Sequence, residues 1–285
     1  LHNELKSLFK EKNILKFPDY GLEPYDLSQI DKTVIRDRYE CFIKLNVIDT
    51  KKIIIATYKS VFYKVPSLND VSKSWKRITK QSTYNEIIDM LRSFGYQKTS
   101  KVEEFGQYRI SGSIIDIFSI ISNKPIRINF FEDKIETIKE FDPISQISSN
   151  ELDEVIICTN AIYNIQNSNI DIYLKNIEDF FDDEYRQDIE YERIVHDRNN
   201  SYIHNLIPIL FDHTDSFLSS FNDDFACVLQ KDLILEFNEQ YDNLNEAYLQ
   251  ENMKRYILDP ERLFVKKETL EKILKDNYFY QISDY

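Results

Sequence analysis

Strict alternation of apolar and polar residues in "PIRINFFEDKIETIKEFD" (125–142) predicts a strand, a turn and a second strand. One face of the first strand is expected to carry Ile126, Ile128 and Phe130, and the other face Arg127, Asn129 and Phe131. The dipeptide Glu132-Asp133 is expected to form the turn. This pattern predicts a hairpin with one buried face and one open face.

A second hairpin is predicted just before it, in "YRISGSIIDIF" (108–118). Gly112 interrupts the strand pattern there, which indicates a bulge or a close approach of another backbone segment. Upstream, "STYNEIIDMLRSFGY" (82–96) predicts a helix of about three turns, because Thr83 and Glu86 have capping-box spacing and Gly95 stands at the C′ position. One helix and two hairpins predict a small α+β unit.

The segment before this unit has an α/β pattern. "IDKTVIRDRYECFIKLN" (30–46) predicts a helix after Asp31 as N-cap, and "KKIIIATY" (51–58) reads as a strand buried on both faces. The expected helical stripe consists of Val34, Ile35, Arg38, Tyr39, Phe42 and Ile43. Such a βαβ-like layout belongs to the α/β class.

From about residue 158 onward the pattern becomes helical and acidic, with "FACVLQ" (225–230) predicted as a short buried strand. Lysine and arginine number 12 against 9 acidic residues in 1–69, 12 against 14 in 70–157, and 12 against 26 in 158–285. These charge zones and the polar stretch after Pro66 predict three units with the same boundaries. The acidic last unit disfavours nucleic-acid binding, which depends on cations.

The three cysteines, Cys41, Cys158 and Cys227, are widely spaced and form no CxxC pair, which predicts free, mostly buried thiols in a reducing cytosol. The apolar runs are too short for a transmembrane helix, and the start of the chain lacks the pattern of a signal peptide. We therefore expect a cytoplasmic protein without membrane contact. Because residue 1 is leucine, we also expect the chain to be part of a longer protein.

Motifs for catalysis are missing from the sequence. There is no GxxxxGK[ST] loop to hold phosphates, so no nucleotide cofactor is expected in this chain. The acidic run 180–185 reads as a solvated helix face, Asp232 reads as surface charge, and His196, His204 and His213 lack zinc-ligand spacing. We expect no catalytic residue and no metal.

Several stretches resemble the N-terminal module of the bacterial transcription-repair coupling factors. They are "FPDYGLEPYD", "YRISGSIIDIF", "PIRINFFEDKIETI" and "EFDPISQ", in that order, with weaker similarity up to "RLFVKKETLEKIL". That module is similar to the damage-verifying protein UvrB. The resemblance implies a degenerate RecA-like, P-loop-derived α/β domain split in two (1–69 and 158–285), with a smaller inserted α+β domain (70–157).

In this family the inserted domain binds the repair protein UvrA, so the resemblance implies UvrA as partner. The implied contact residues are Arg127 and Phe131, at positions like those of the family's arginine and phenylalanine. Ser111 replaces a second family arginine, while Arg109 matches an arginine of the UvrB version and could supply that charge. Asn129 stands where UvrB has an acidic residue. ATP and Mg²⁺ are implied only for the motor of the full-length parent.

Three interpretations stay open at this point. The chain can be a non-catalytic module that recruits UvrA, an ATP-dependent UvrB-like helicase domain whose P-loop lies upstream of Leu1, or a clamp that masks its surface against other domains of the full-length chain. An exposed strand face with one arginine, one amide and one aromatic can also lack any partner. We favour the recruiting module, since an arginine beside an exposed aromatic is typical of interface hot spots.

Overall fold

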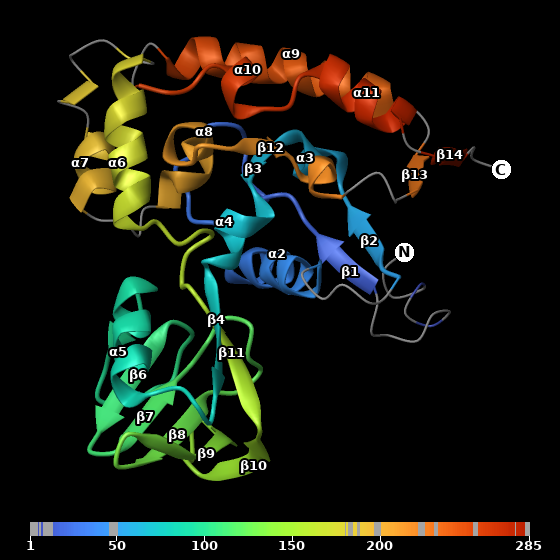
Figure 1. Cartoon of the computed structure of the whole chain (residues 1–285). Helices are drawn as coiled ribbons and strands as arrows, with labels where there is room; N and C mark the ends of the chain where they lie inside the picture. Colours follow the sequence, from blue (N-terminus) through green and yellow to red (C-terminus); the bar gives the residue numbers. More distant parts are fainter. Residues whose placement is uncertain are drawn as a thin grey trace.

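The computed structural model describes residues 5, 7, 14–45, 51–179, 181, 185–186, 189–196, 201–221, 226–230, 233–252, 256–276 and 278–282. Two lobes are visible in Figure 1, and the strand pair β4 and β11 runs between them. The smaller one, called the sheet lobe here, consists of α5 and β5–β10. All other elements apart from the β4–β11 pair belong to the larger lobe.

The sheet lobe is a six-stranded sheet covered on one face by one helix. The strands are β5 (Gln97–Lys98), β6 (Gln107–Ser111), β7 (Ile114–Ile117), β8 (Ile126–Phe131), β9 (Lys134–Phe141) and β10 (Ser148–Leu152), in the spatial order β10-β9-β8-β7-β6-β5. Neighbouring strands from β6 to β10 are antiparallel, and β5 runs parallel to β6. Both predicted hairpins, β6–β7 and β8–β9, are therefore confirmed.

Helix α5 (Tyr84–Ser93) confirms the predicted capping signals. The Thr83 hydroxyl accepts from the N–H of Glu86, and the Glu86 carboxylate accepts from the N–H of Thr83 at 3.0 Å. Gly95 ends the helix with φ +72°, a conformation in which a Cβ would be strained. The apolar side of α5 packs on the sheet in one continuous cluster with the inward side chains of β7, β8 and β9.

The prediction of a bulge or a close backbone approach at Gly112 is wrong. Ser111 pairs with Ile114, so Gly112 and Ser113 form a two-residue turn between β6 and β7. Gly112 has φ +59°, as the first central residue of a type II′ turn requires, and an added Cβ would find no atom within 4 Å. The irregularity of pairing lies instead between β8 and β9, at Asn129/Phe130.

In the larger lobe, β1 (Ile14–Phe17), α2 (Lys32–Leu45) and β2 (Ile53–Ala56) form the predicted βαβ unit, with β1 and β2 parallel. The next elements are α3 (Tyr58–Phe62), β3 (Lys64–Pro66), α4 (Leu68–Ser72), β4 (Trp75–Thr79) and, after the sheet lobe, β11 (Glu154–Cys158). The helices that follow include α6 (Asn167–Asn176), α7 (Ile189–His196), α8 (Ile207–Leu210), α9 (Leu233–Glu251), α10 (Pro260–Leu263) and α11 (Lys267–Asp276). Short 3-10 turns lie among them, including η2 (Ile177–Asp179), η4 (Ser201–Asn205) and η5 (Phe217–Ser220). Strand β12 (Thr214–Ser216) pairs with β3, and β13 (Ala226–Gln230) pairs with β14 (Tyr278–Ile282).

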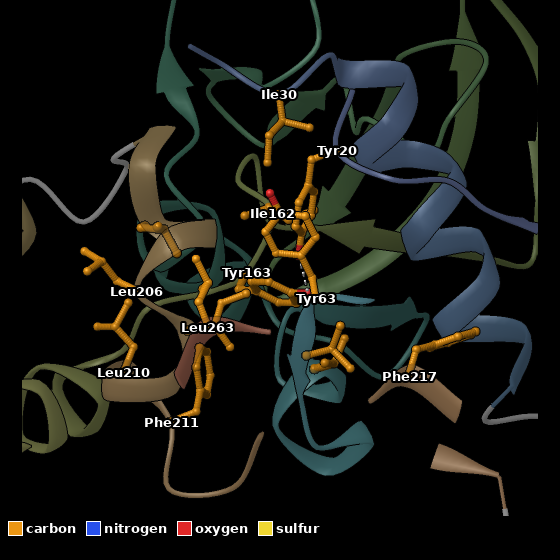
Figure 2. Packing of buried hydrophobic residues seen from close by; sticks show 14 of the residues in the cluster. Tyr20, Ile30, Tyr63, Ile162, Tyr163, Leu206, Leu210, Phe211, Phe217 and Leu263 are labelled. Atoms are coloured by element: carbon orange, nitrogen blue, oxygen red, sulfur yellow. Dashed lines mark hydrogen bonds between the residues drawn. The ribbon is translucent and has the colours of Figure 1, made fainter. Parts of the chain in front are cut away.

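Many aromatic residues of the chain form the core of the larger lobe (Figure 2). The hydroxyls of Tyr20 and Tyr163 lie 3.3 Å apart, and the rings of Phe17 and Phe217 are stacked. Arg38, on the predicted helical stripe of α2, is buried over the Phe17 and Tyr20 rings at 4.0 and 4.4 Å from their centroids. These contacts explain the high tyrosine and phenylalanine content through core packing.

The two lobes also touch through α2. The Arg36 guanidinium donates to the Ser122 carbonyl at 3.0 Å and to the Asn123 side-chain oxygen at 3.1 Å. The Lys32 ammonium donates to the Phe105 carbonyl at 3.4 Å. Together with the β4–β11 pair, these contacts hold the sheet lobe against the larger lobe.

Two burial predictions fail. Strand β2 is not buried on both faces: Ile53, Ile54 and Ile55 are half-buried and Ala56 is exposed, because β2 pairs only with β1 in the part of the chain described. In β13, Ala226 and Val228 are exposed, so the strand is not buried there. Cys41 and Cys158 are free and buried as predicted, and burial raises the pKa of the Cys41 thiol to about 12.

Several candidate residues lie outside the described part. Asp182, Asp183 and Glu184 of the acidic run, and Asp232, are among them. Among the residues that are described, no group of three or more His, Cys, Asp or Glu side chains is placed to hold a metal ion. A helix long and apolar enough to span a membrane is likewise not found in that part of the chain.

Candidate protein interface

The face of the six-stranded sheet opposite α5, called the outer face here, carries all five predicted contact residues. On β8, Ile126, Ile128 and Phe130 are buried toward α5, as the alternation predicts. Arg127, Asn129 and Phe131 therefore point to the outer face. Arg109 and Ser111 of β6 join them there, because the pairing with β7 places Arg109 beside Asp116 and Ser111 beside Ile114.

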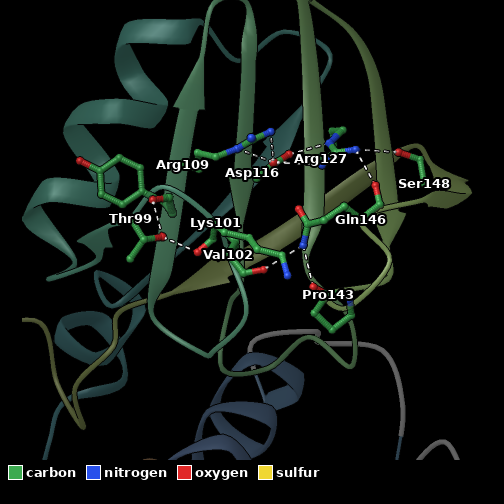
Figure 3. Close-up of polar contacts among 10 residues, drawn as sticks. Thr99, Lys101, Val102, Arg109, Asp116, Arg127, Pro143, Gln146 and Ser148 are labelled. Carbon is green, nitrogen blue, oxygen red and sulfur yellow. Dashed lines mark hydrogen bonds and ion pairs between the residues drawn. The ribbon is translucent and has the colours of Figure 1, made fainter.

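Asp116 lies between the two arginines, and sequence reasoning missed it. It pairs with Arg109 across β6–β7 and with Arg127 across β7–β8. Its side chain is 0% exposed, and both carboxylate oxygens are ion-paired: Oδ1 lies 2.7 Å from Nε of Arg127, and Oδ2 lies 2.9 Å from Nη2 of Arg109 (Figure 3). The alternation in "SIIDIF" would have placed this acid on the outer face, but only the strand register shows which arginines it meets.

Arg127 is not the freely exposed arginine that the strand pattern predicted. Its side chain is only 16% exposed, and all three of its nitrogens have partners. Nε and Nη2 donate to Asp116 at 2.7 and 3.1 Å, while Nη1 donates to the Gln146 carbonyl at 3.0 Å. The guanidinium also lies over the Phe141 ring, 4.5 Å from its centroid. Arg127 thus ties three parts of the sheet lobe together.

Arg109 is held more loosely. Its Nε and Nη2 contact Asp116 at 3.1 and 2.9 Å, and its side chain is 30% exposed. Within the described part of the chain, Nη1 of Arg109 has no hydrogen-bond acceptor. Of the two outer-face arginines, Arg109 is therefore the more exposed one and the one with a guanidinium nitrogen that meets no acceptor among the residues described.

The other outer-face residues differ in exposure. Phe131 is 70% exposed beside the turn of the β8–β9 hairpin. Asn129 is half-buried and donates to the Thr137 hydroxyl at 2.7 Å, and Ser111 is exposed. Lys139 lies opposite Arg127 and forms an ion pair with Glu151 at 3.6 Å. A row of charged side chains therefore crosses the sheet from β6 to β10, with the cations Arg127 and Lys139 side by side.

The turn after β9 presents two more apolar side chains, Ile144 and Ile147, both exposed. Within residues 77–163, all of which are described, Phe131 is the other large hydrophobic residue with an exposed side chain. The Asp142 carboxylate accepts from the N–H groups of Ile144 and Ser145 at 3.1 and 2.7 Å. These hydrogen bonds hold the pKa of Asp142 below its usual value, and the bond from the Ser145 N–H has the largest effect.

Comparison with known proteins assigns this lobe to a class. Residues 77–163 match the family model described as UvrB interaction domain. This stretch contains the entire six-stranded sheet and α5, so the similarity to a UvrB interaction domain covers the whole sheet lobe.

Nearly the whole chain is similar to transcription-repair-coupling factors. The protein of that name from Rickettsia bellii is 26% identical over 291 residues, which cover 97% of this chain and 26% of the relative. The Borreliella burgdorferi protein is 38% identical over 103 residues, 35% of this chain and 9% of the relative. The Escherichia coli protein is 23% identical over 64% of this chain and 16% of its own length.

The chain is a homologue of the transcription-repair-coupling factors, as the sequence resemblance predicted. It spans about a quarter of the length of the relatives it matches most extensively.

Proposed function

We propose that this chain is a non-catalytic, cytoplasmic module that recruits UvrA to a transcription-repair coupling factor, and that UvrA docks on the outer face of the sheet lobe. In this proposal residues 70–157 form the docking domain. Residues 1–69 and 158–285 form the two parts of a degenerate RecA-like domain, and further domains of a longer parent chain are additional partners. The separate hydrophobic cluster that runs from Ile78 to Ile157 supports the proposed docking domain.

One observation carries the proposal. Inside the UvrB interaction domain, an aromatic side chain that is 70% exposed stands on the same sheet face as two ion-paired arginines. Aromatic and arginine side chains are enriched in the hot spots of protein interfaces, where they supply most of the binding free energy. A solvent-exposed phenylalanine has no packing role in this lobe, whereas a partner pocket would bury it.

The five contact residues take different roles in this model. Phe131 is the apolar anchor, and Arg109 donates to an acceptor on UvrA. Ser111 and Asn129 line the face between them, with Asn129 already bonded to Thr137. Arg127 contributes the exposed edge of a guanidinium that the lobe itself holds in place.

The charge of the chain favours a protein partner over a nucleic acid. Residues 70–157 carry 12 basic and 14 acidic residues, and residues 158–285 carry 12 and 26. Binding to a phosphate backbone needs an excess of cations, so we expect duplex DNA to bind no tighter than the nonspecific range of roughly 10⁻⁴ M at physiological salt. Submicromolar binding in a fluorescence titration would contradict this model.

The decisive experiment is a calorimetric titration of UvrA into the 285-residue chain, with Phe131→Ala as the variant. The matched control is Leu249→Ala, since Leu249 on α9 is 66% exposed and lies in the larger lobe. Phe131→Ala is expected to weaken binding by about tenfold or more, while Leu249→Ala binds like the wild type. UvrA binding that is absent from the wild type, or equal in both variants, would refute the docking role.

The non-catalytic part of the proposal has its own test. A chain without a glycine-rich phosphate loop lacks the backbone amides that hold a nucleotide. We expect the purified chain to show no ATPase activity above a buffer control and no saturable ATP binding. ATP hydrolysis that a point substitution within this chain abolishes would instead support the helicase interpretation.

A further inference from the structure

Asp116 is the most deeply buried charged group of the outer face. It lies in the middle of the sheet, on β7, and has no exposed surface. Its two oxygens accept four contacts from two arginines: from Nε and Nη2 of Arg127 at 2.7 and 3.1 Å, and from Nε and Nη2 of Arg109 at 3.1 and 2.9 Å. A buried carboxylate is tolerated only with such complete pairing.

Stability alone does not explain this arrangement. Apolar residues of similar volume in place of a buried ionic group are often as stable or more stable. What the carboxylate adds is orientation. It accepts two hydrogen bonds from Arg127, and its Oδ2 contacts both Nε and Nη2 of Arg109, so each guanidinium is restricted in its plane as well as its position. On the outer face, that orientation matters most for the arginine with a guanidinium nitrogen that meets no acceptor in the described part of the chain.

That arginine is Arg109. Arg127 has its third nitrogen bonded to Gln146, whereas Nη1 of Arg109 meets no acceptor among the described residues. A long arginine side chain normally loses rotamer entropy when it binds, and one that is already fixed loses less. An Arg109 side chain that Asp116 already fixes in the free protein therefore gives a higher affinity for a partner.

We propose that Asp116 is a positioning residue, which orients Arg109 so that its remaining N–H groups meet a carboxylate or carbonyl oxygen of the docked partner. This inference rests on the proposed docking function. It assigns Asp116 an effect on affinity that passes through Arg109 and is separate from its effect on folding.

A double-mutant cycle in the full 285-residue chain tests it. UvrA is titrated into the wild type, Arg109→Ala, Asp116→Asn and the double variant, at a temperature well below the lowest melting point of the four. Arg109→Ala is expected to weaken binding about tenfold and Asp116→Asn about fivefold. The double variant should bind only slightly more weakly than Arg109→Ala alone, because without Arg109 the carboxylate holds only Arg127, which stays bonded to the Gln146 carbonyl as well.

The outcomes separate the two proposals. If Arg109→Ala binds weakly but Asp116→Asn binds like the wild type, Asp116 is purely structural and this inference is wrong. Additive losses in the double variant also overturn it, since Asp116 would then act independently of Arg109. If the wild type does not bind UvrA, or if neither Arg109→Ala nor Phe131→Ala weakens binding, the docking function itself fails and this inference with it.

A second variant covers the case in which Asp116→Asn does not fold. Arg109→Lys keeps the positive charge and the Asp116 ion pair but lacks the planar fork that two hydrogen bonds can orient. It should lose most of the affinity that Arg109→Ala loses, while its thermal melt stays close to that of the wild type. Affinity equal to that of the wild type would show that orientation of the guanidinium is not needed.

Discussion

Nη1 of Arg127 donates to the main-chain oxygen of Gln146 at 3.0 Å, which ties the middle of β8 to the turn between β9 and β10. Gln146 has φ +61°, a left-handed conformation uncommon for a residue with a side chain. Its side-chain amide donates to the carbonyls of Pro143 and Val102, at 2.7 and 3.4 Å. The arginine therefore stabilises a turn that presents exposed side chains, in addition to its pairing with Asp116.

Arg127→Ala is expected to destabilise the chain by about 2 kcal/mol, because it leaves the buried Asp116 with one arginine and removes the bond to Gln146. This is more than the 0.5 kcal/mol or less that an exposed strand position would predict. Urea unfolding measures the difference. Arg92→Ala is the control, since Arg92 is 69% exposed in its ion pair with Asp89 and should change stability little. Equal unfolding midpoints for both variants would contradict the anchoring role of Arg127.

Gly112→Ala should cost about 1–2 kcal/mol of folding free energy, because φ +59° strains any residue with a Cβ. Space is not the cause, as the added methyl group would meet no atom within 4 Å. Gly112→Asn should recover a small part of the loss, since asparagine follows glycine among the residues that the first central position of a type II′ turn accepts. A larger loss for Asn than for Ala, measured in thermal melts, would point to crowding in place of backbone strain.

Acid is expected to weaken the start of α5. The N–H of Thr83, bonded to the Glu86 carboxylate, is the main cause that lowers the pKa of Glu86 below its ordinary 4.5. A carboxylate with a lowered folded-state pKa contributes stability above the unfolded pKa, and this contribution is lost as the pH falls through the folded value. Unfolding free energies measured from pH 6 to pH 3 should thus fall less steeply below about pH 4.5 in Glu86→Gln than in the wild type. Parallel curves would show that this capping bond adds no pH dependence.

Local sequence signals were sufficient for α5 and the two hairpins of the sheet lobe, but not for the edge strands β5 and β10. Alternation on β8 and the capping box at Thr83 each depend on residues within six positions of one another, so the faces of the strand and the start of the helix could be predicted. Gly112 was correctly predicted to interrupt the strand pattern, but its turn was interpreted as a bulge or a close backbone approach. The difference depends on strand register, which the glycine alone does not fix.

The burial of Arg127 and its bonding partners could not be predicted in the same way. Its partners are Asp116, eleven residues earlier, and the Gln146 carbonyl, nineteen residues later. Only the pairing of β7 with β8 and the path of the turn after β9 bring them together. Burial of β2 failed for a related reason, because an apolar run predicts a buried strand only where neighbours cover both of its faces.

Ile128→Ala provides the test of the inner face of β8. Ile128 is fully buried between the sheet and α5, so its truncation removes apolar contacts and leaves a cavity. We expect a loss of about 2–5 kcal/mol in unfolding free energy. Ser111→Ala on the exposed outer face should cost about 0.5 kcal/mol or less, and serves as the control. At a temperature at which Ile128→Ala remains folded, its affinity for UvrA should match that of the wild type, because the outer-face residues keep their contacts. A loss of affinity in the folded variant would mean that the two faces of β8 do not act separately.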